Sequence, residues 1–410
     1  MRRQVLLLVV LSGCGGEITV PDAAELDPDA SAALDAARLD AAALDSPDAA
    51  APDAPLVIDA LPADDAATVD ARLTIGDAGA VSCEPVATTE LVRDLAGLPF
   101  EVSPRHVSAE WQLIFDNGVS VNHVLAPVAG TVSTISGLLL DPSGLSSASA
   151  MRALTSYGVR GSDDVVVVGT PAGTDEIWIW STVSARARVV GPGVLAGGAV
   201  PLGSDTLLAA RTDGGGVHAM LASTGGEVAL GVASSSELAF GVGPSGGAWV
   251  AAAHPTACEV LALSADGVVS DRMTVPVPDG CDRVALASLG GTRAALAIVS
   301  GGRLLHTRVD RASGDVEGFA DLGPALPGDL SVVGDDAGAV RITWQRAATE
   351  LGSTAISSDG SFTRSSCVTA DLGAPDFARA RSARFGDTTV VVLGPAGRAG
   401  RGLRQATFRD

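Results

Sequence analysis

The sequence contains no lysine: its 27 basic residues are all arginine, against 48 acidic residues. The resulting formal net charge of −21 argues against binding to nucleic acid or to anionic lipid, because both need basic patches. Aromatic residues make up only 3% of the chain, whereas glycine occurs 49 times. This composition is typical of many short strands joined by tight turns rather than of long helices.

The apolar run near the N-terminus, Val5–Leu11, is far shorter than the ~20 residues that cross a membrane as a helix. Two arginines precede this run, and small residues and Cys14 follow it. This is the layout of a secretory signal with a cleavage site of small residues. We therefore predict that residues 1–13 are a signal peptide that is removed during export.

The stretch Leu11–Cys14 (LSGC) resembles the lipobox of bacterial lipoproteins in both sequence and position. The resemblance implies lipid attachment to the Cys14 sulfur and cleavage before this residue, and several acyl chains give a stable anchor. Gly15 stands where that family's sorting rule would place an aspartate to hold a protein at the inner membrane. The expected location is therefore the outer membrane, on its periplasmic or cell-surface side. The alternative is an ordinary signal peptide followed by a chance cysteine.

Residues 15–80 carry 15 acidic residues against two arginines and contain no aromatic residue. Such a segment cannot bury enough apolar surface to offset the entropy lost on ordering. We predict that residues 14–80 form a disordered Ala/Asp/Pro-rich tether with a root-mean-square span of roughly 45 Å. The tether would hold the folded part, residues 81–410, away from the membrane.

Seven apolar stretches recur along residues 81–410, and their starts lie between 41 and 53 residues apart. A period in the forties indicates a β-propeller or another repeat array. The stretches are Trp111–Asn117, Asp164–Thr170, Leu207–Asp213, Ala248–His254, Ala294–Ser300, Val340–Arg346 and Thr389–Pro395.

Each repeat contains further short strands separated by turn residues such as Asp266–Gly267, which is a strong hairpin signal. Four antiparallel strands per period form one propeller blade. We therefore predict an all-β fold, a seven-bladed β-propeller of four-stranded antiparallel blades, with no specific propeller family indicated. The last repeat ends after its third strand, and Leu91–Gly97 would supply the missing outer strand and close the ring.

Four cysteines remain besides Cys14, and an even number in an exported chain predicts two disulfides. Cys258 and Cys281 are expected in loops on one face of the same blade, which favours a bond between them. A bond between Cys83 and Cys367 follows by elimination and would join the closing strand to the neighbouring blade. A disulfide needs Cβ atoms about 4 Å apart, while the outer strands of adjacent blades diverge, so this second pairing stays open.

No catalytic constellation, metal site or cofactor site is predicted. Gly243–Gly247 (GPSGG) matches the G-x-S-x-G nucleophile pattern, but a strand follows it where that pattern requires a helix, which favours a hairpin turn. No two of the five histidines have a ligand-like spacing, so neither a zinc site nor a catalytic triad is indicated.

In a propeller, the loops between blades share one face with the loops between second and third strands, and ligands usually bind there. The longest repeat has its excess residues at Asp141–Met151, in the loop that leads into the second blade. The candidate binding residues on this face are Asn117, Asp175, Glu176, Asp213, His254, Arg346, Glu350, Arg398 and Arg401.

These observations favour a lipid-anchored binding or protein-interaction scaffold with a protein or glycan ligand. One alternative is a propeller enzyme, a hydrolase or lyase that acts on an extracellular polymer. This would need carboxylates and histidines clustered around the channel mouth. A second alternative is a factor in outer-membrane assembly.

Overall fold

The computed structural model describes residues 84–85, 89–92, 100–105, 110–116, 121–127, 138–140, 151–171, 176–181, 187–192, 197–212, 214–347, 350–368, 377–385, 387–395 and 403–409. The chain divides into two units, Met1–Ala67 and Thr68–Asp410, and every described residue lies in the second unit. The signal peptide, the tether, Cys14 and Cys83 lie outside the described residues, so the expectations for them remain predictions.

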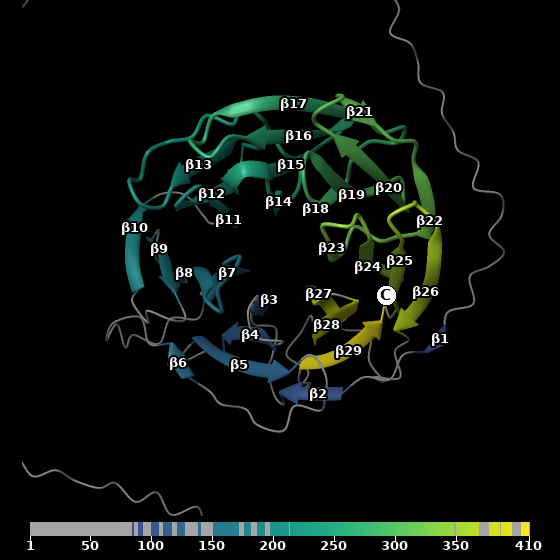
Figure 1. Cartoon of the computed structure of the whole chain (residues 1–410), viewed down its shortest axis with the longest axis horizontal. Helices are drawn as coiled ribbons and strands as arrows, with labels where there is room; N and C mark the ends of the chain where they lie inside the picture. The colour runs from purple at the N-terminus through teal and green to yellow at the C-terminus, as the bar shows by residue number, and fades with distance from the viewer. Residues whose placement is uncertain are drawn as a thin grey trace, which may run out of the picture. The chain divides into compact units, whose positions relative to one another are not determined.

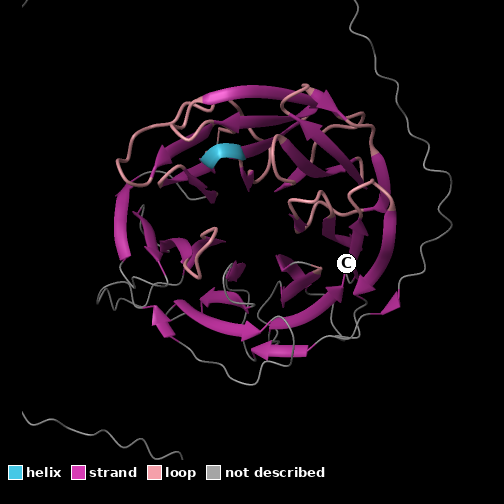
Figure 2. Ribbon diagram, viewed as in Figure 1, coloured by secondary structure: helices cyan, strands magenta, loops and turns pink. Residues whose placement is uncertain are grey.

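The described residues form β-strands and one short 3-10 helix, Pro244–Gly246 (Figure 2). Within these residues, no helix is long and apolar enough to cross a membrane. The described strands assemble into seven sheets. We number the sheets, and the strands within each sheet, in chain order from residue 100 onward, because the two short strands before residue 100 only join the edges of the last two sheets. Figure 1 shows the first strand of each sheet nearest a common centre and later strands toward the rim. The described part of the chain is an all-β domain of the propeller type.

The first four sheets contain consecutive strands only. Sheet 1 is β3 (Phe100–Arg105), β4 (Glu110–Asp116), β5 (Val121–Pro127) and β6 (Leu138–Leu140). Sheet 2 is β7 (Met151–Gly158), β8 (Val165–Pro171), β9 (Glu176–Ser181) and β10 (Ala187–Pro192). Sheet 3 is β11 (Gly198–Leu202), β12 (Asp205–Arg211) and β13 (Val217–Leu221). Sheet 4 is β14 (Ala239–Val242), β15 (Ala248–His254), β16 (Ala257–Leu263) and β17 (Val269–Pro276).

Sheets 5 to 7 follow, and the last two of them also include strands from the N-terminal part of the unit. Sheet 5 is β18 (Arg283–Ser288), β19 (Arg293–Ser300), β20 (Arg303–Asp310), β21 (Asp315–Val316) and β22 (Ala320–Pro324). Sheet 6 is β23 (Leu330–Gly334), β24 (Val340–Ala347), β25 (Glu350–Ile356) and β26 (Phe362–Val368), with β1 (Glu84–Pro85) at its edge. Sheet 7 is β27 (Phe377–Phe385), β28 (Thr388–Pro395) and β29 (Leu403–Arg409), with β2 (Thr89–Val92) at its edge.

The seven repeated apolar stretches coincide with the second strands of the seven sheets, as β15 illustrates. Trp249 on β15 belongs to the same core cluster as Leu296 of sheet 5, whereas the next residue, Val250, clusters with Leu207 of sheet 3. Both faces of the strand are therefore covered by neighbouring sheets. A strand buried on both faces is a continuous apolar run rather than an alternating one, which explains why these strands dominate the sequence pattern.

The first strands of the sheets, here called the inner strands, contact one another in the order β3, β7, β11, β14, β18, β23 and β27, and β27 in turn contacts β3. The two ends of the described chain also pair. Strand β2 runs antiparallel to β29, with Thr89 opposite Gln405. The sequence placed this edge strand at Leu91–Gly97. The described strand begins two residues earlier, at Thr89, and residues 93–97 lie outside the described residues.

Strand β1 pairs in parallel with β26, with Glu84 opposite Ser366 and Pro85 opposite Cys367. The N-terminal segment therefore contributes edge strands to two sheets, whereas the sequence predicted only one. Cys83 precedes β1 directly but lies outside the described residues, so the Cys83–Cys367 bond remains a prediction.

Sheet 3 departs from the expected four strands. Beyond β13 the chain makes only isolated bridges, Met220 with Glu227 and Gly216 with Ala233. The guanidinium of Arg272, on β17 of sheet 4, donates hydrogen bonds to the backbone carbonyls that lie between these bridges, at Leu230 and Gly231. The segment after β13 is therefore held to the next sheet by a side chain and is joined to β13 only by these two bridges.

Candidate functional site

Three successive loops between sheets are fixed to the sheet before them in the same way. Ser234 N–H donates to the Gly215 carbonyl at 2.8 Å, and Cys281 N–H donates to the His254 carbonyl at 3.2 Å. In the third loop, Ala325 N–H donates to Gly302 at 2.9 Å. Each acceptor lies at or next to the turn between the second and third strands of the preceding sheet.

The residue that follows each of these donors bonds to the second strand of the next sheet. Ser235 N–H donates to Ala253 at 2.7 Å, Asp282 to Val299 at 2.9 Å and Leu326 to Gln345 at 2.8 Å. From sheet 3 to sheet 6, the loops between sheets and the turns between second and third strands therefore share one face, as the sequence analysis expected of a propeller. We call it the loop face.

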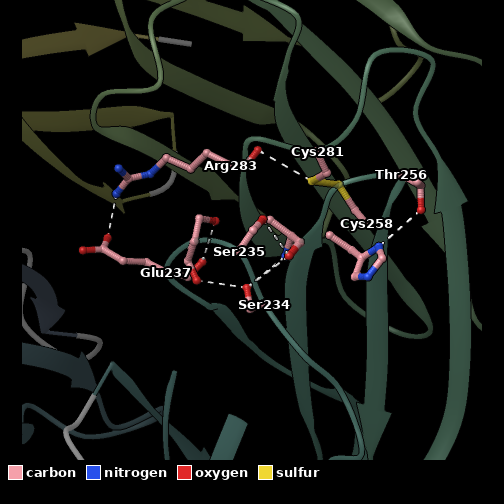
Figure 3. Close-up of a disulfide and its surroundings, with 10 residues drawn as sticks. Ser234, Ser235, Glu237, Thr256, Cys258, Cys281 and Arg283 are labelled. Carbon is pink, nitrogen blue, oxygen red and sulfur yellow. Dashed lines mark hydrogen bonds and ion pairs between the residues drawn. A yellow bond between two sulfur atoms is a disulfide. The ribbon is translucent and has the colours of Figure 1, made fainter. Parts of the chain in front are cut away.

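A disulfide between Cys258 and Cys281 ties the loop before sheet 5 to sheet 4 (Figure 3). The Cα atoms are 5.7 Å apart, and both side chains are buried. Cys258 lies at the start of β16, and Cys281 lies two residues before β18. This confirms the predicted Cys258–Cys281 bond and fixes the backbone that leads to Arg283.

Five charged side chains from five sheets form a connected series, which we call the inner charge chain. It consists of Glu237, Arg283, Asp329, Arg381 and Glu101. Arg283 Nη2 lies 2.7 Å from Glu237 Oε2 and 3.4 Å from Asp329 Oδ1. Arg381 Nη1 lies 2.6 Å from Asp329 Oδ2, and its Nε lies 2.9 Å from Glu101 Oε1. The sign of the charge alternates from each sheet to the next.

Asp329 is the central member of the inner charge chain, and its side chain is 5% exposed. A buried carboxylate must be paired and hydrogen-bonded, because burial removes its hydration. Its partners are the two guanidinium groups and the backbone N–H of Ala380. The carboxylate therefore holds Arg283 of sheet 5 and Arg381 of sheet 7 in fixed positions.

Arg381 remains charged despite its surroundings. Burial by itself lowers the pKa of this guanidinium, but the charges of Glu101 and Asp329 outweigh that effect and raise the pKa well above its ordinary value. The opposite end of the chain is open, since the side chain of Glu237 is 70% exposed. The inner charge chain thus runs from a partly buried pair between sheets 7 and 1 to a solvent-exposed carboxylate beside sheet 4.

Three of the predicted binding residues are described with their side chains, and all three lie at turns between second and third strands. His254 is exposed at the end of β15, and its Nδ1 lies 3.2 Å from Thr256 Oγ1. Arg346 and Glu350 face each other across the turn between β24 and β25, with Nη1 and Oε1 3.0 Å apart. Their role in binding remains a prediction.

The other predicted binding residues are not brought together by the described part of the structure. Glu176 begins β9, and only its backbone is described. The remaining five lie outside the described residues, namely Asn117, Asp175, Asp213, Arg398 and Arg401.

The sequence analysis selected none of the inner charge chain. A usable signal was present, because Glu237, Arg283 and Asp329 each lie within two residues of the start of an inner strand in successive repeats, with alternating sign. A pattern of catalytic side chains that lie close together in the sequence does not include these residues, since no two of them are close in sequence.

The described residues show neither a metal-binding cluster nor a nucleophile motif in the required context. No group of three or more His, Cys, Asp or Glu side chains there could hold a metal ion. The GPSGG stretch is the hairpin turn between β14 and β15, with Val242 opposite Ala248, as the sequence indicated. Ser245 in this turn has a φ of 53°, which is a left-handed conformation.

No protein-family model matches the chain, and no curated protein matches its sequence. Solved structures resemble its fold. They include a lectin of Aleuria aurantia in complex with Fucα1-6GlcNAc, at 13% identity and a TM-score of 0.46, over 76% of this chain and 93% of that one. A puromycin hydrolase is 15% identical with a TM-score of 0.47, over 76% of this chain and 53% of that one. A chain of the mitotic checkpoint complex is 14% identical with a TM-score of 0.48, over 91% and 98%. At these values the likeness concerns the fold alone.

Proposed function

We propose that the chain is a lipid-anchored protein of the bacterial cell envelope whose residues 81–410 form a closed seven-bladed β-propeller. We further propose that the loop face of this propeller binds a glycan or a protein partner. The circular series of inner-strand contacts and the pairing of β2 with β29 support the ring. A ring completed by both ends of the chain leaves no open edge between its first and last blades.

The observation that carries the binding role is the inner charge chain. A fold that required only packed sheets would gain little from these charges, because removing charged groups from water costs several kcal/mol per ion before pairing returns it. The polypeptide nevertheless positions charges of alternating sign at five successive sheets, and it leaves the carboxylate of Glu237 exposed at one end of this series. Charged groups held rigidly by neighbours and open on one side are suited to recognition of a polar ligand.

Binding is tested with the full chain as bait for envelope proteins and on a panel of glycans. Substitution of the exposed Glu237 by arginine on the loop face is compared with Glu227→Arg, which alters an exposed residue in the turn after β13. A specific ligand that is lost only with Glu237→Arg supports the proposal. Equal binding by both variants and the wild type would place recognition elsewhere. Cleavage of a polymer would favour an enzyme, and altered outer-membrane protein levels after gene deletion would favour an assembly factor.

The lipid anchor rests on the LSGC stretch and on the acidic, proline-containing tether that follows it. It is tested by growing expressing bacteria with a clickable fatty acid and comparing the wild type with Cys14→Ala. Label in the wild type alone is expected, and label in both or in neither contradicts the anchor. Gly15→Asp should move the labelled protein from the outer-membrane to the inner-membrane fraction.

A further inference from the structure

The ion pair at the open end of the inner charge chain uses only part of its hydrogen-bonding capacity. Arg283 engages Glu237 and Asp329 through the same atom, Nη2. In the described part of the chain, Arg283 Nε and Nη1 and Glu237 Oε1 make no hydrogen bond or ion pair. A guanidinium carries five N–H donors and a carboxylate oxygen accepts, so donors and an acceptor remain side by side within one pair.

The position of this pair is fixed from three directions. Asp329 holds the guanidinium from the buried side, and the Cys258–Cys281 disulfide fixes the backbone two residues earlier. The N–H of Asp282, next to Arg283, donates to the Val299 carbonyl at 2.9 Å. A preorganised group loses less side-chain entropy on binding than a flexible one. Figure 3 shows the side chains of Glu237, in the loop before β14, and of Arg283, at the start of β18, reaching toward each other.

The charges around the pair select the class of ligand. The same loop exposes Asp279 and Asp282, and the whole chain carries a net charge of −21, so an anionic ligand is repelled. A cationic ligand would compete with Arg283 for the carboxylate of Glu237. A neutral ligand that donates to Glu237 and accepts from Arg283 meets neither obstacle.

We infer that Glu237 and Arg283 bind neighbouring hydroxyl groups of a neutral saccharide on the loop face. One hydroxyl donates to Glu237 Oε1 while the next accepts from Arg283 Nη1 or Nε, and the existing ion pair is kept. The inference rests on the proposed binding function and narrows it to a ligand class and two residues. It uses no metal ion or covalent step.

The test measures binding of the full chain to methyl glycosides of glucose, galactose and mannose by ligand-observed NMR. Galacturonate and glucosamine serve as charged counterparts of galactose and glucose. We expect a neutral glycoside to bind more tightly than its charged counterpart. Because hydrogen bonds to charged groups are strong, Glu237→Ala and Arg283→Lys should each weaken binding at least about tenfold. Lysine keeps the charge of Arg283 but not its planar array of donors.

Glu227→Ala is the matched control and should bind as the wild type does. Glu237 is mostly exposed, so its variant keeps the test valid even if Arg283→Lys folds poorly. Saccharide binding that neither variant changes would overturn the inference, as would tighter binding of galacturonate than of galactose. Failure of every saccharide to bind would also overturn it. The proposed function would still stand if the same protein captured an envelope protein through the loop face.

Discussion

His306 should make the domain less stable in mild acid. It lies on β20 with a side chain only 5% exposed, and its Nδ1 lies 2.9 Å from the Leu296 carbonyl, to which the neutral ring donates. Burial is the main cause that lowers the pKa of His306 to about 4. The hydrogen bond to the Leu296 carbonyl opposes this shift, and the charge of Arg308 adds the smallest contribution, in the same direction as burial. The folded domain therefore holds this imidazole neutral where an unfolded chain would protonate it.

The sign and size of the effect follow from proton linkage. Because the folded pKa of about 4 lies below the unfolded value of about 6.5, the unfolded chain takes up the proton first as the pH falls. The stability associated with neutral His306 is fully present above about pH 6.5 and is lost progressively down to about pH 4. Between about pH 7.5 and about pH 4.5 the loss amounts to about 2.5 kcal/mol.

The assay is urea unfolding of the wild type and of His306→Gln at these two pH values. Glutamine can still donate to the Leu296 carbonyl but does not titrate, so the variant should lose about 2.5 kcal/mol less than the wild type on acidification. His218→Gln changes an exposed histidine on β13 and should behave as the wild type does. If His306→Gln and the wild type lose the same free energy, burial does not hold His306 neutral and the reasoning is wrong.

Three further predictions concern the stability of the domain, each measured by urea unfolding at neutral pH. Replacing both Cys258 and Cys281 by serine should lower the free energy of unfolding by about 3 kcal/mol, because the disulfide closes a loop with a sequence separation of 23. An unchanged free energy of unfolding would mean that the disulfide does not constrain the unfolded chain. Asp329→Asn should lower the free energy of unfolding by about 3 kcal/mol, since two guanidinium groups lose a buried anionic partner. As a control, Asp282→Asn at an exposed position should change the free energy of unfolding by less than about 0.5 kcal/mol. Ser245→Gly should stabilise by up to about 1 kcal/mol, because only glycine adopts a φ of 53° without strain; destabilisation would show that the serine side chain has an unrecognised contact.

The second strands could be predicted from the sequence because each one is a continuous apolar run, which is visible in a short stretch of sequence. Val250 and its neighbours on β15 are buried on both sides, so they form an apolar run that can be recognised without knowing what covers it. The outer strands are less regular. In sheet 3, the segment after β13 forms no fourth strand, and two of its carbonyls instead accept hydrogen bonds from Arg272, 41 and 42 residues away. No local sequence pattern indicates contacts at that separation.

The inner charge chain was out of reach of the sequence analysis for a related reason. Arg381 and Glu101 are 280 residues apart, and they meet only because β27 contacts β3. A glutamate or an arginine at the start of a strand is ordinary when considered alone. Its significance appears once the inner strands are in order, since opposite charges then face each other between neighbouring sheets.

The disulfide connects the proposed location of the protein with the proposed binding site. Bonds of this kind form in oxidising compartments outside the cytosol, which agrees with the export predicted from residues 1–13. Cys281 lies two residues before Arg283, and its backbone N–H also bonds to the turn at His254. Oxidation therefore fixes the loop that positions the Arg283 guanidinium. A chain kept reduced would retain the packed second strands, whose apolar contacts do not depend on this bond, but would hold the open end of the inner charge chain less rigidly.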